Sequence, residues 1–326
     1  MRRPHLSPRA TGLLLGYCAD RLLGDPRRFH PVAAFGSAAT ELERRLYTDS
    51  RMRGVTYTVL LVGSVAGLGV AVERLTARSP IARTACTALA TWAVLGGRSL
   101  EREATAVRVL LEEEDLPGAR RRLKSLVGRD TSELEASEVS RAVVESVAEN
   151  SSDAVVAPLL WGAVAGIPGL VAYRATNTLD AMVGHRSPRY ERFGWASARW
   201  DDLLNLPGAR LAGVLTAAAV PSRARSVLRT WRRDAGSHPS PNAGVVEASF
   251  AGALDLRLGG TNRYGTRSEH RPVLGDGRSV EATDIEHTTA LARRVGFGAA
   301  LTSAALAAVM GPPTLRGTLR RDRTRP

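Results

Sequence analysis

The sequence is poor in cysteine and contains a single lysine. Its two cysteines, Cys18 and Cys86, lie in apolar stretches and form no C-x-x-C pair. A zinc cluster or a disulfide framework is therefore not expected, and we interpret both residues as buried thiols. Lys124 is the only lysine among 45 basic residues. We attribute this bias to genomic base composition, so the net charge of +13 carries little functional weight.

The standard signatures of nucleotide and zinc sites are also absent. The sequence contains no G-x-x-x-x-G-K-[ST], no G-x-G-x-x-G between a strand and a helix, and no H-E-x-x-H. These absences exclude the usual phosphate loop, dinucleotide fold and zinc protease. Residues 1–8 carry arginines but no apolar run with a cleavage site, so we expect no removable signal peptide. Only the charge favours a nucleic-acid binder, because interleaved aromatic residues and a recognisable binding module are lacking.

Long uncharged runs are present instead. Residues 54–72, 154–173 and 295–315 contain no charged side chain and reach the ~20 residues that a helix needs to cross a bilayer. An amphipathic helix on a soluble core would show a charge at every third or fourth position. Residues 80–97 and 203–221 are weaker candidate spans, because each contains one arginine.

These runs predict an all-α fold, namely a polytopic α-helical integral membrane protein with helical polar loops, built as a single domain over residues 1–326. Five arginines and one aspartate follow the last run in residues 316–326. By the positive-inside rule this basic tail is expected in the cytoplasm. A large soluble helical core is the alternative, and recovery of the protein in the soluble fraction would indicate it.

A dense polar segment precedes the second uncharged run. Glu138, Arg141, Glu145 and Glu149 are spaced by three, four and four residues, so on a helix they share one face. Such a face at a membrane surface is suited to Mg²⁺ and the phosphates that it carries. An exposed helix with ordinary i,i+4 pairs explains the pattern equally well. The run Asn-Ser-Ser-Asp that ends at Asp153 adds further oxygen donors, where a helix cap would need only one.

More polar residues follow that run. Arg174, Asn177 and Asp180 repeat at i, i+3 and i+6, and polar groups so placed usually face a protein interior or a wet cavity. Asp201 and Asp202 form an acidic pair that is suited to a second metal position. A helix start with favourable dipole charges is the simpler alternative for this pair.

Several distinct motifs follow one another along the chain. They are Asp20-Arg-Leu-Leu-Gly-Asp-Pro26 with His30-Pro31, Glu145-Ser-Val-Ala-Glu-Asn150 with Asp153, Tyr173-Arg-Ala-Thr-Asn-Thr-Leu-Asp-Ala-Met182, Asp201-Asp202 with Asn205, Ser240-Pro-Asn-Ala-Gly244 with Glu247, and Leu258-Gly-Gly260. In this combination the sequence resembles the CobD/CbiB family of cobalamin-biosynthesis proteins. The likeness covers roughly residues 10–310, and the ordered set is far more specific than any single motif.

The resemblance implies an adenosylcobinamide-phosphate synthase, a multi-pass enzyme of the cell membrane whose active site faces the cytoplasm. Such an enzyme uses ATP and Mg²⁺ to join a propionate carboxylate of adenosylcobyric acid to aminopropanol or its O-phosphate. A carboxylate is a poor acyl donor, so an acyl phosphate is the expected intermediate. Membrane lipid and other late corrinoid-pathway enzymes are the further partners that it suggests. The alternative is a corrinoid-binding or transporting membrane protein without ligase activity.

Residue type suggests roles at the matched positions. We expect the catalytic and nucleotide-binding carboxylates to be Glu145, Glu149, Asp153 and Asp180. The expected substrate-binding and phosphate-binding residues are Arg141, Arg174, Asn150, Asn177, Asn242 and His30, although a structural role is the simpler interpretation of His30. The expected Mg²⁺ ligands are Glu149, Asp153, Asp201 and Asp202.

One uncharged run raises a problem of topology. If residues 154–173 crossed the bilayer fully, Glu149 and Arg174 would lie on opposite sides, yet ATP and the corrinoid precursor are both cytosolic. The run contains two prolines and three glycines, which are Pro158, Gly162, Gly166, Pro168 and Gly169. We therefore predict a broken or re-entrant hairpin, which is tolerated at membrane depth where it is packed in protein.

Overall fold

The computed structural model describes residues 7–25, 31–128, 130–185, 187–264 and 267–310. The helices are α1 (Pro8–Leu23), α2 (Pro31–Leu46), α3 (Arg51–Leu75), α4 (Pro80–Val94), α5 (Gly97–Glu112), α6 (Leu116–Leu123), α7 (Ala136–Ser151), α8 (Ala157–Leu179), α9 (Trp195–Ala219), α10 (Ala224–Asp234), α11 (Ala243–Leu254) and α12 (Asp284–Met310). Short helical turns are η1 (Ser152–Val156), η2 (Asp180–Gly184), η3 (Pro221–Arg223) and η4 (Ala235–Ser237). The two strands are β1 (Leu258–Tyr264) and β2 (Arg267–Leu274).

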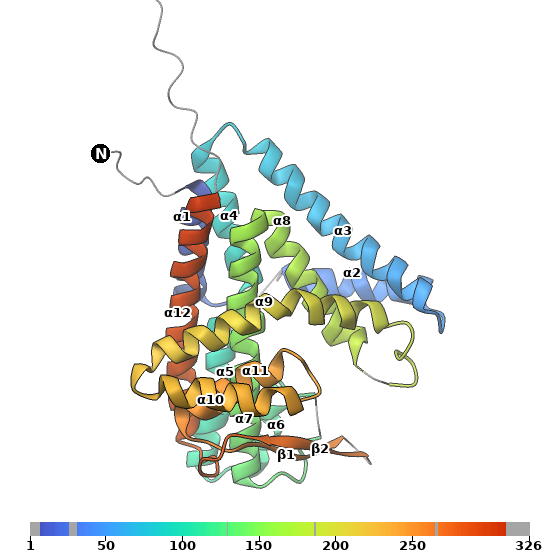
Figure 1. The fold of residues 1–326 in the computed structure, drawn as a ribbon. Helices are drawn as coiled ribbons and strands as arrows, with labels where there is room; N and C mark the ends of the chain where they lie inside the picture. Colours follow the sequence, from blue (N-terminus) through green and yellow to red (C-terminus); the bar gives the residue numbers. More distant parts are fainter. Residues whose placement is uncertain (1–6, 26–30, 129, 186, 265–266, 311–326) are drawn as a thin grey trace, which may run out of the picture.

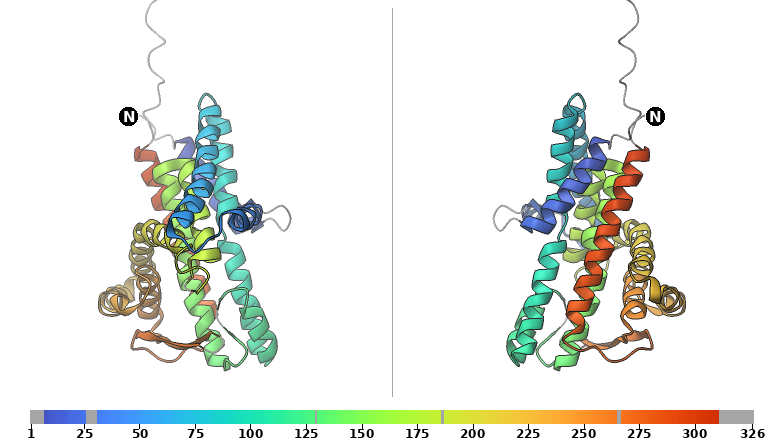
Figure 2. Two further views of the ribbon diagram at one scale, coloured as in Figure 1. Left: turned by 90° about the vertical axis from the view of Figure 1, so that its right-hand side faces the viewer. Right: turned by 90° about the vertical axis from the view of Figure 1, so that its left-hand side faces the viewer.

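The helices divide into an apolar end and a polar end. Figure 1 shows α1, α4, the upper part of α3, α8 and the last turns of α12 at one end, with α5, α6, α7, α10, α11 and the strands at the other. Figure 2 shows that the turn joining α3 to α4 lies at the tip of the apolar end. Large apolar side chains are exposed there, among them Leu60 and Leu68 on α3 and Ile81 on α4. An apolar surface of this kind marks an interaction with a membrane or a partner.

Among the residues that the structure describes, two helical stretches are long and apolar enough to cross a membrane by length and composition, Arg51–Leu75 and the series Ala136–Gly184. A third qualifies only if α9 and the following Pro221–Ser237, which is bent from it by 107°, count as one span. The apolar helices agree with the expectation of a membrane-associated chain.

The remaining expected spans stay predictions. The run 80–97 corresponds to α4, which has 15 residues, and the run 203–221 forms the second part of α9. The run 295–315 begins inside α12, and its last residues, like the tail 316–326, lie outside the described residues.

Helix α8 reverses direction at Gly166. This glycine has φ +67° and ψ −147°, a conformation that L side chains rarely adopt, and Pro168 begins the second half of the helix soon after it. In a straight helix, residues 153 and 173 would lie about 30 Å apart along the axis. Instead the Tyr173 hydroxyl lies 3.1 Å from the carbonyl oxygen of Asp153. The uncharged block is therefore a helical hairpin whose two ends lie side by side.

Two charged side chains bind the backbone groups that the break leaves without helical partners. Arg9 of α1 donates to the carbonyl oxygens of Ala163 and Val164 at 3.2 and 3.3 Å. Glu73 of α3 accepts from the backbone N–H of Ile167 at 3.1 Å. The two side chains lie 3.7 Å apart as an ion pair. This ion pair thus supplies hydrogen-bond partners to the last turn of the first half of α8 and to the first turn of the second half. Helix termini in apolar surroundings require such partners.

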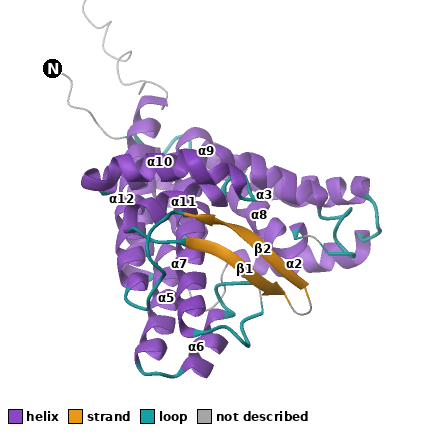
Figure 3. Cartoon of the chain, turned by 60° about the horizontal axis from the view of Figure 1, so that its bottom comes forward, coloured by secondary structure: helices purple, strands orange, loops and turns teal. Residues whose placement is uncertain are grey.

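A β-hairpin departs from the expected all-α fold. Strands β1 and β2 pair antiparallel within a segment that we expected to form a polar loop, with an irregularity between Leu258 and Gly260. Figure 3 shows this hairpin lying across α7 and α11 at the polar end. The prediction of a chain without sheet is wrong for this segment, because Leu258 and Leu274 supply buried apolar side chains to a small core beside α7.

We expect Glu73→Ala to lower the free energy of unfolding by roughly 1–3 kcal/mol, because the Ile167 N–H and the Arg9 guanidinium would lose their partner. Thermal unfolding in detergent measures the change. Glu41→Ala is the matched control, since Glu41 forms only exposed pairs with Arg44 and Arg45. Equal stability of the two variants would contradict this account of the helix break.

The reversal also predicts which side of a membrane each flank of the hairpin faces. In a protein whose native cysteines are replaced by serine, we expect Ser132→Cys and Pro188→Cys to react with an impermeant maleimide from the same side of sealed vesicles. Both positions are exposed, and they flank the series that contains α7 and α8. Labelling of the two positions from opposite sides would show that α8 crosses without turning.

Candidate functional site

Two π-helical turns lie at the open ends of the α8 hairpin. The turn η1 places Asp153 between α7 and α8, and the turn η2 begins with Asp180 directly after α8. π-helical turns are rare and often occur at functional sites, because the extra residue moves a side chain out of the regular helical register. The reversal at Gly166 brings these two turns to the same end of the hairpin.

Helix α9 supplies the frame of hydrogen bonds between them. The amide of Asn205 donates to one oxygen of Asp201 at 2.9 Å, and the amide of Asn177 donates to the other at 3.3 Å. The Tyr173 hydroxyl lies 2.6 Å from the Asn205 side-chain oxygen and donates to it or to the Asp153 carbonyl. Tyr173, Asp201 and Asn205 are all buried. Their network fixes α9 against both arms of the hairpin.

Negative charge predominates in this cluster. The carboxylates of Glu149, Asp153, Asp180 and Asp201 lie within electrostatic range of one another. Arg174 is the cation that acts on Asp153, and its own charge also interacts with Asp25. Like charges in a low-dielectric environment repel strongly unless a cation balances them. We call these four carboxylates with Arg174, Asn177 and Asn205 the carboxylate cluster.

The donor set fits a hydrated magnesium ion better than a dedicated metal cage. Within the described ranges, no three His, Cys, Asp or Glu side chains are close enough together to hold a metal. Mg²⁺ usually takes one or two carboxylates and keeps water or substrate phosphate as its other ligands. Glu149 and Asp153 are the candidates here, because the amides of Asn177 and Asn205 already occupy both oxygens of Asp201.

Asp202 lies within electrostatic range of Asp180 and Asp201 and has further partners of its own. Its carboxylate lies 3.7 Å from Arg199, and its backbone carbonyl accepts a hydrogen bond from Asn242 at 2.7 Å. The second metal position at Asp201 and Asp202 therefore stays a prediction. Asp201 already accepts hydrogen bonds from two amides, and Asp202 lies near the guanidinium of Arg199.

The structure places Arg141 and Glu145 beside the β-hairpin. Glu145 accepts from the backbone N–H of Gly259 at 2.9 Å, and Arg141 donates to the carbonyl oxygen of the same residue. Their side chains form an ion pair of 3.7 Å. Both therefore hold β1 against α7. Along the helix axis Arg141 lies about 18 Å from Asp153, so the structure places Arg141 at the β-hairpin and not in the carboxylate cluster, whereas Glu145 lies one helical turn before Glu149.

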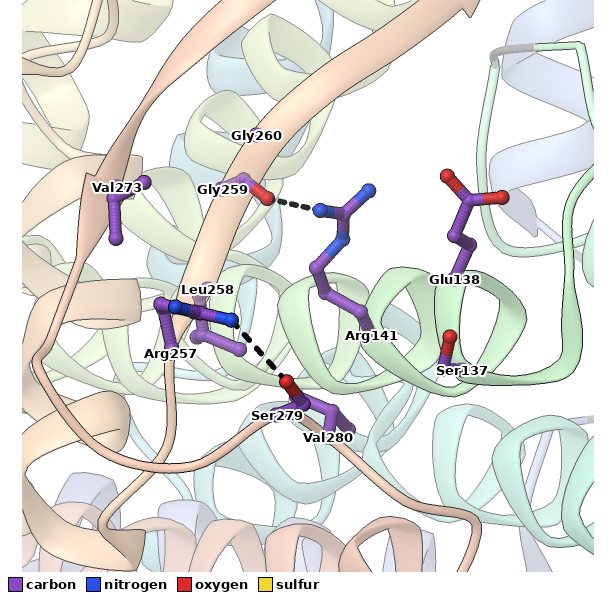
Figure 4. Close-up of a pocket in the computed structure, with 10 residues that line it drawn as sticks. All are labelled: Ser137, Glu138, Arg141, Arg257, Leu258, Gly259, Gly260, Val273, Ser279 and Val280. Carbon is purple, nitrogen blue, oxygen red and sulfur yellow. Dashed lines mark hydrogen bonds between the residues drawn. The ribbon is translucent and has the colours of Figure 1, made fainter.

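A cavity of about 280 Å³ opens at this contact, with Ser137, Arg141, Arg257 and Ser279 among its lining residues. Figure 4 shows the Arg141 side chain reaching Gly259, with Glu138 facing it from one turn earlier on α7. Gly260 has φ +104°, and a Cβ atom there would lie 2.5 Å from the Arg141 guanidinium. The second glycine of the Leu-Gly-Gly motif is thus explained by a close approach between strand and helix.

The other predicted binding residues have local partners. Asn150 donates to the carbonyl oxygen of Ser146 in its own helix at 2.9 Å. Asn242 accepts from Arg210 at 2.8 Å while it donates to α9, so it joins the start of α11 to that helix. Their roles in substrate binding stay predictions. His30 lies outside the described residues.

Reasoning from the sequence passed over three residues of this site. Tyr173 and Asn205 lie inside the quoted motifs, but neither was singled out as a site residue. Asp25 lies in the first motif, far from the others in sequence, and only the fold brings it into electrostatic range of Arg174. The available signal for Asn205 was its position four residues after Asp201, on the same helical face.

Comparisons with known proteins agree with the resemblance that the ordered motifs indicate. A family model described as CobD/Cbib protein matches residues 13–292. The chain is 53% identical over 297 residues to a cobalamin biosynthesis protein CobD of Mycobacterium tuberculosis, a match that covers 90% of this chain and 94% of that protein. Proteins of the same name from Geobacter metallireducens and Sinorhizobium fredii are 45% and 40% identical, with 91% and 93% of this chain and 95% and 97% of those proteins covered. No solved structure matches the chain.

The excess of negative charge predicts a dependence of stability on divalent cations. We expect Mg²⁺ to raise the unfolding temperature of the wild-type protein in detergent, with a stabilisation of about 2.7 kcal/mol at a hundredfold excess over the dissociation constant. Asp153→Asn should raise the unfolding temperature without Mg²⁺, because one repulsive charge is removed, and should reduce the effect of Mg²⁺. Asp49→Asn, at an exposed position on the loop before α3, is the control. An Mg²⁺ response of Asp153→Asn equal to that of the control would exclude the carboxylate cluster as the cation site.

Proposed function

The chain belongs to the CobD/Cbib family and is a cobalamin biosynthesis protein, and we propose that it catalyses an ATP-dependent amide ligation. The proposed reaction joins a propionate carboxylate of adenosylcobyric acid to (R)-1-amino-2-propanol or its O-phosphate. The product is adenosylcobinamide or its phosphate. The proposal assigns the chain to the acid–amine ligases.

One observation carries this proposal: the reversal of α8 gathers four carboxylates and one guanidinium from α7, α8, α9 and the two π turns. A ligase of this type must hold a polyphosphate, a carboxylate and an amine together. The carboxylate cluster offers acidic side chains for a hydrated cation and for an ammonium group. Arg174 offers a guanidinium for phosphate or carboxylate.

The reaction needs activation of the acid before the amide forms. A carboxylate oxygen of the corrinoid attacks the γ-phosphorus of ATP, so that ADP leaves and an acyl phosphate remains. The amine nitrogen then attacks the acyl carbon, the carbon–oxygen bond to phosphate breaks, and inorganic phosphate leaves. The ammonium substrate must lose a proton before attack, and a carboxylate within hydrogen-bond reach can accept it.

The residues of the cluster divide these tasks. Glu149 and Asp153 would hold the magnesium ion that accompanies the nucleotide, and this ion supplies neutralisation of charge on the transferred phosphoryl group. Asp180, at the start of η2, is placed to orient or deprotonate the amine. The amides of Asn177 and Asn205 hold the Asp201 carboxylate in place, and its fixed charge contributes to the negative potential of the site. Tyr173 and Asn205 are positioning residues, because they bind other members of the cluster.

The surroundings suit an enzyme of the membrane surface. The end of α7 and both ends of α8, which carry members of the carboxylate cluster, lie between the apolar end and the polar end of the molecule (Figure 1). We propose that the apolar end is embedded in the cell membrane and that the cluster faces the cytoplasm, where ATP and the corrinoid acid are available. Other late corrinoid-pathway enzymes are proposed neighbours at the same surface.

The test is an assay of the purified protein in detergent with adenosylcobyric acid, ATP, Mg²⁺ and aminopropanol with or without its phosphate. Product mass identifies the amide and also shows which amine is used. We expect amide formation with release of ADP and phosphate. Binding of the corrinoid without any ATP-dependent product would favour the corrinoid-binding or transporting protein instead.

Variants locate the reaction at the cluster. We expect Asn205→Ala to lower kcat/KM by 10–100-fold, because Asp201 and Tyr173 lose the amide that orients them. Asp153→Asn is expected to lose on the order of 100-fold or more. Asp130→Asn, at an exposed position outside the cluster, is the control for expression and detergent effects. Wild-type rates for Asn205→Ala and Asp153→Asn would remove the cluster from the mechanism.

A further inference from the structure

An apolar groove lies on the side of the α8 hairpin that faces α3 and α4. It has a volume of about 420 Å³. Its walls come from α2, α3, α4 and the second half of α8, with Phe35, Val65, Leu89 and Val171 as representative residues. Leu68 and Leu89 lie at its rim and are 65% and 60% exposed, so the groove is accessible from the outer surface of the apolar end. Protein interiors are close-packed, and an accessible apolar space of this size is typical of a ligand site.

The groove has one polar end. Arg174 is the only charged residue among its described lining residues. The Nε atom of Arg174 is buried and has no hydrogen-bond partner in the part of the chain that the structure describes. Asp25 and Asp153 lie within electrostatic range of the guanidinium, on the side of the carboxylate cluster. A buried guanidinium N–H without a partner costs free energy until an acceptor binds it, and a phosphate oxygen is a strong acceptor.

The length of the groove matches one leaflet of a bilayer. Along the second half of α8 its lining extends from Ile167, next to the turn, to Thr178, one turn beyond Arg174. The eleven steps from Ile167 to Thr178 rise by about 16 Å, roughly half of the ~30 Å hydrocarbon core. Ile167 lies next to the turn of the hairpin, and Arg174 lies about two helical turns further along α8, toward the polar end of the molecule. Its polarity therefore runs in the same direction as that of a phospholipid in one leaflet.

We propose that this groove binds one membrane glycerophospholipid, with an acyl chain between α3, α4 and α8 and the phosphodiester on Arg174. The acyl chain contributes through burial of its methylene groups, and the phosphate binds the guanidinium of Arg174, which lines the groove. The lipid then lies against the second half of α8, beside the carboxylate cluster, and shares Arg174 with it. Lipid binding needs neither nucleotide nor corrinoid, and a change at the rim residue Leu68, which lies outside the cluster, separates it from the proposed ligation.

The binding experiment uses delipidated full-length protein in detergent and native mass spectrometry. The probes are phosphatidylglycerol, diacylglycerol with the same acyl chains, and inorganic phosphate. We expect one phosphatidylglycerol to bind at least about tenfold more tightly than diacylglycerol, a difference of about 1.4 kcal/mol. Inorganic phosphate should not compete with it. Equal binding of both lipids, or displacement by inorganic phosphate, would overturn the proposal.

Two variants and one control locate the lipid. Arg174→Gln removes the cation, and Leu68→Trp fills the rim of the groove. Each is expected to weaken phosphatidylglycerol binding by about tenfold or more. Leu60→Trp is the matched control, because Leu60 is exposed on the same helix and does not line the groove. Variant affinities equal to that of the control would overturn the assignment.

A measurement on the wild-type protein makes the test independent of how the variants fold. A phosphatidylglycerol with a photoreactive group at the end of one acyl chain should crosslink to the part of the groove near the turn. Peptides that contain Val72 or Ile167 are the expected products. Crosslinks distributed over the outer faces of α3 and α12 would show unspecific contact with lipid and would overturn the proposal. If Leu68→Trp loses lipid binding but keeps ligation, the proposed function still holds. If the protein binds the lipid but shows no ligation, the lipid site still holds and the proposed function fails.

Discussion

The fold of this chain depends on one interruption of an apolar helix and on the ion pair that stabilises it. A broken helix exposes backbone carbonyl and N–H groups, and in apolar surroundings each of these groups needs a partner. Arg9 binds the carbonyl oxygens before the break, and Glu73 binds the N–H after it. The two side chains come from helices that are distant in sequence. A glycine at position 166 supplies the left-handed backbone that the turn requires.

Because α8 returns on itself, residues from separate motifs meet. Asp153 lies in the π turn η1 and Asp180 in the π turn η2. The second arm of the hairpin brings Tyr173 and Arg174 beside the start of the first arm, where the Tyr173 hydroxyl contacts the Asp153 carbonyl. Helix α9 closes the arrangement through Asn205. The resulting site combines excess negative charge with a single guanidinium at the border between an apolar and a polar half. This is the electrostatic setting that a magnesium–polyphosphate and an ammonium substrate require.

Much of this arrangement could be predicted from residue patterns, and the remainder could not, for physical reasons. Uncharged runs predicted α3 and α8, and the glycines and prolines of the second run predicted its break. Arg174, Asn177 and Asp180 were predicted to be polar groups that face a protein interior or a wet cavity. The helical face that includes Arg141 and Glu145 was interpreted as one site, but the face is long enough to serve two contacts, and its first part binds β1.

No pattern in the sequence indicated the β-hairpin or the π turns. The strands contain glycines, arginines and a proline instead of an alternating apolar pattern, so their pairing depends on packing against α7 and α11. A π turn contains one extra residue in a helix, and this residue can be of any type, so no residue pattern in the sequence marks its position. Asp25 and Arg174 interact across a long stretch of sequence, and only the assembled fold brings them together.

The central claim is that the ends of the uncharged block lie side by side, so that the carboxylates and Arg174 form one site. Spin labels at Asn150 and Thr178, in a protein without other cysteines, measure this directly by double electron–electron resonance. A continuous helix would separate the two positions by about 42 Å along its axis. The account predicts a single distance far shorter than this value. A distance distribution centred near 40 Å would contradict it.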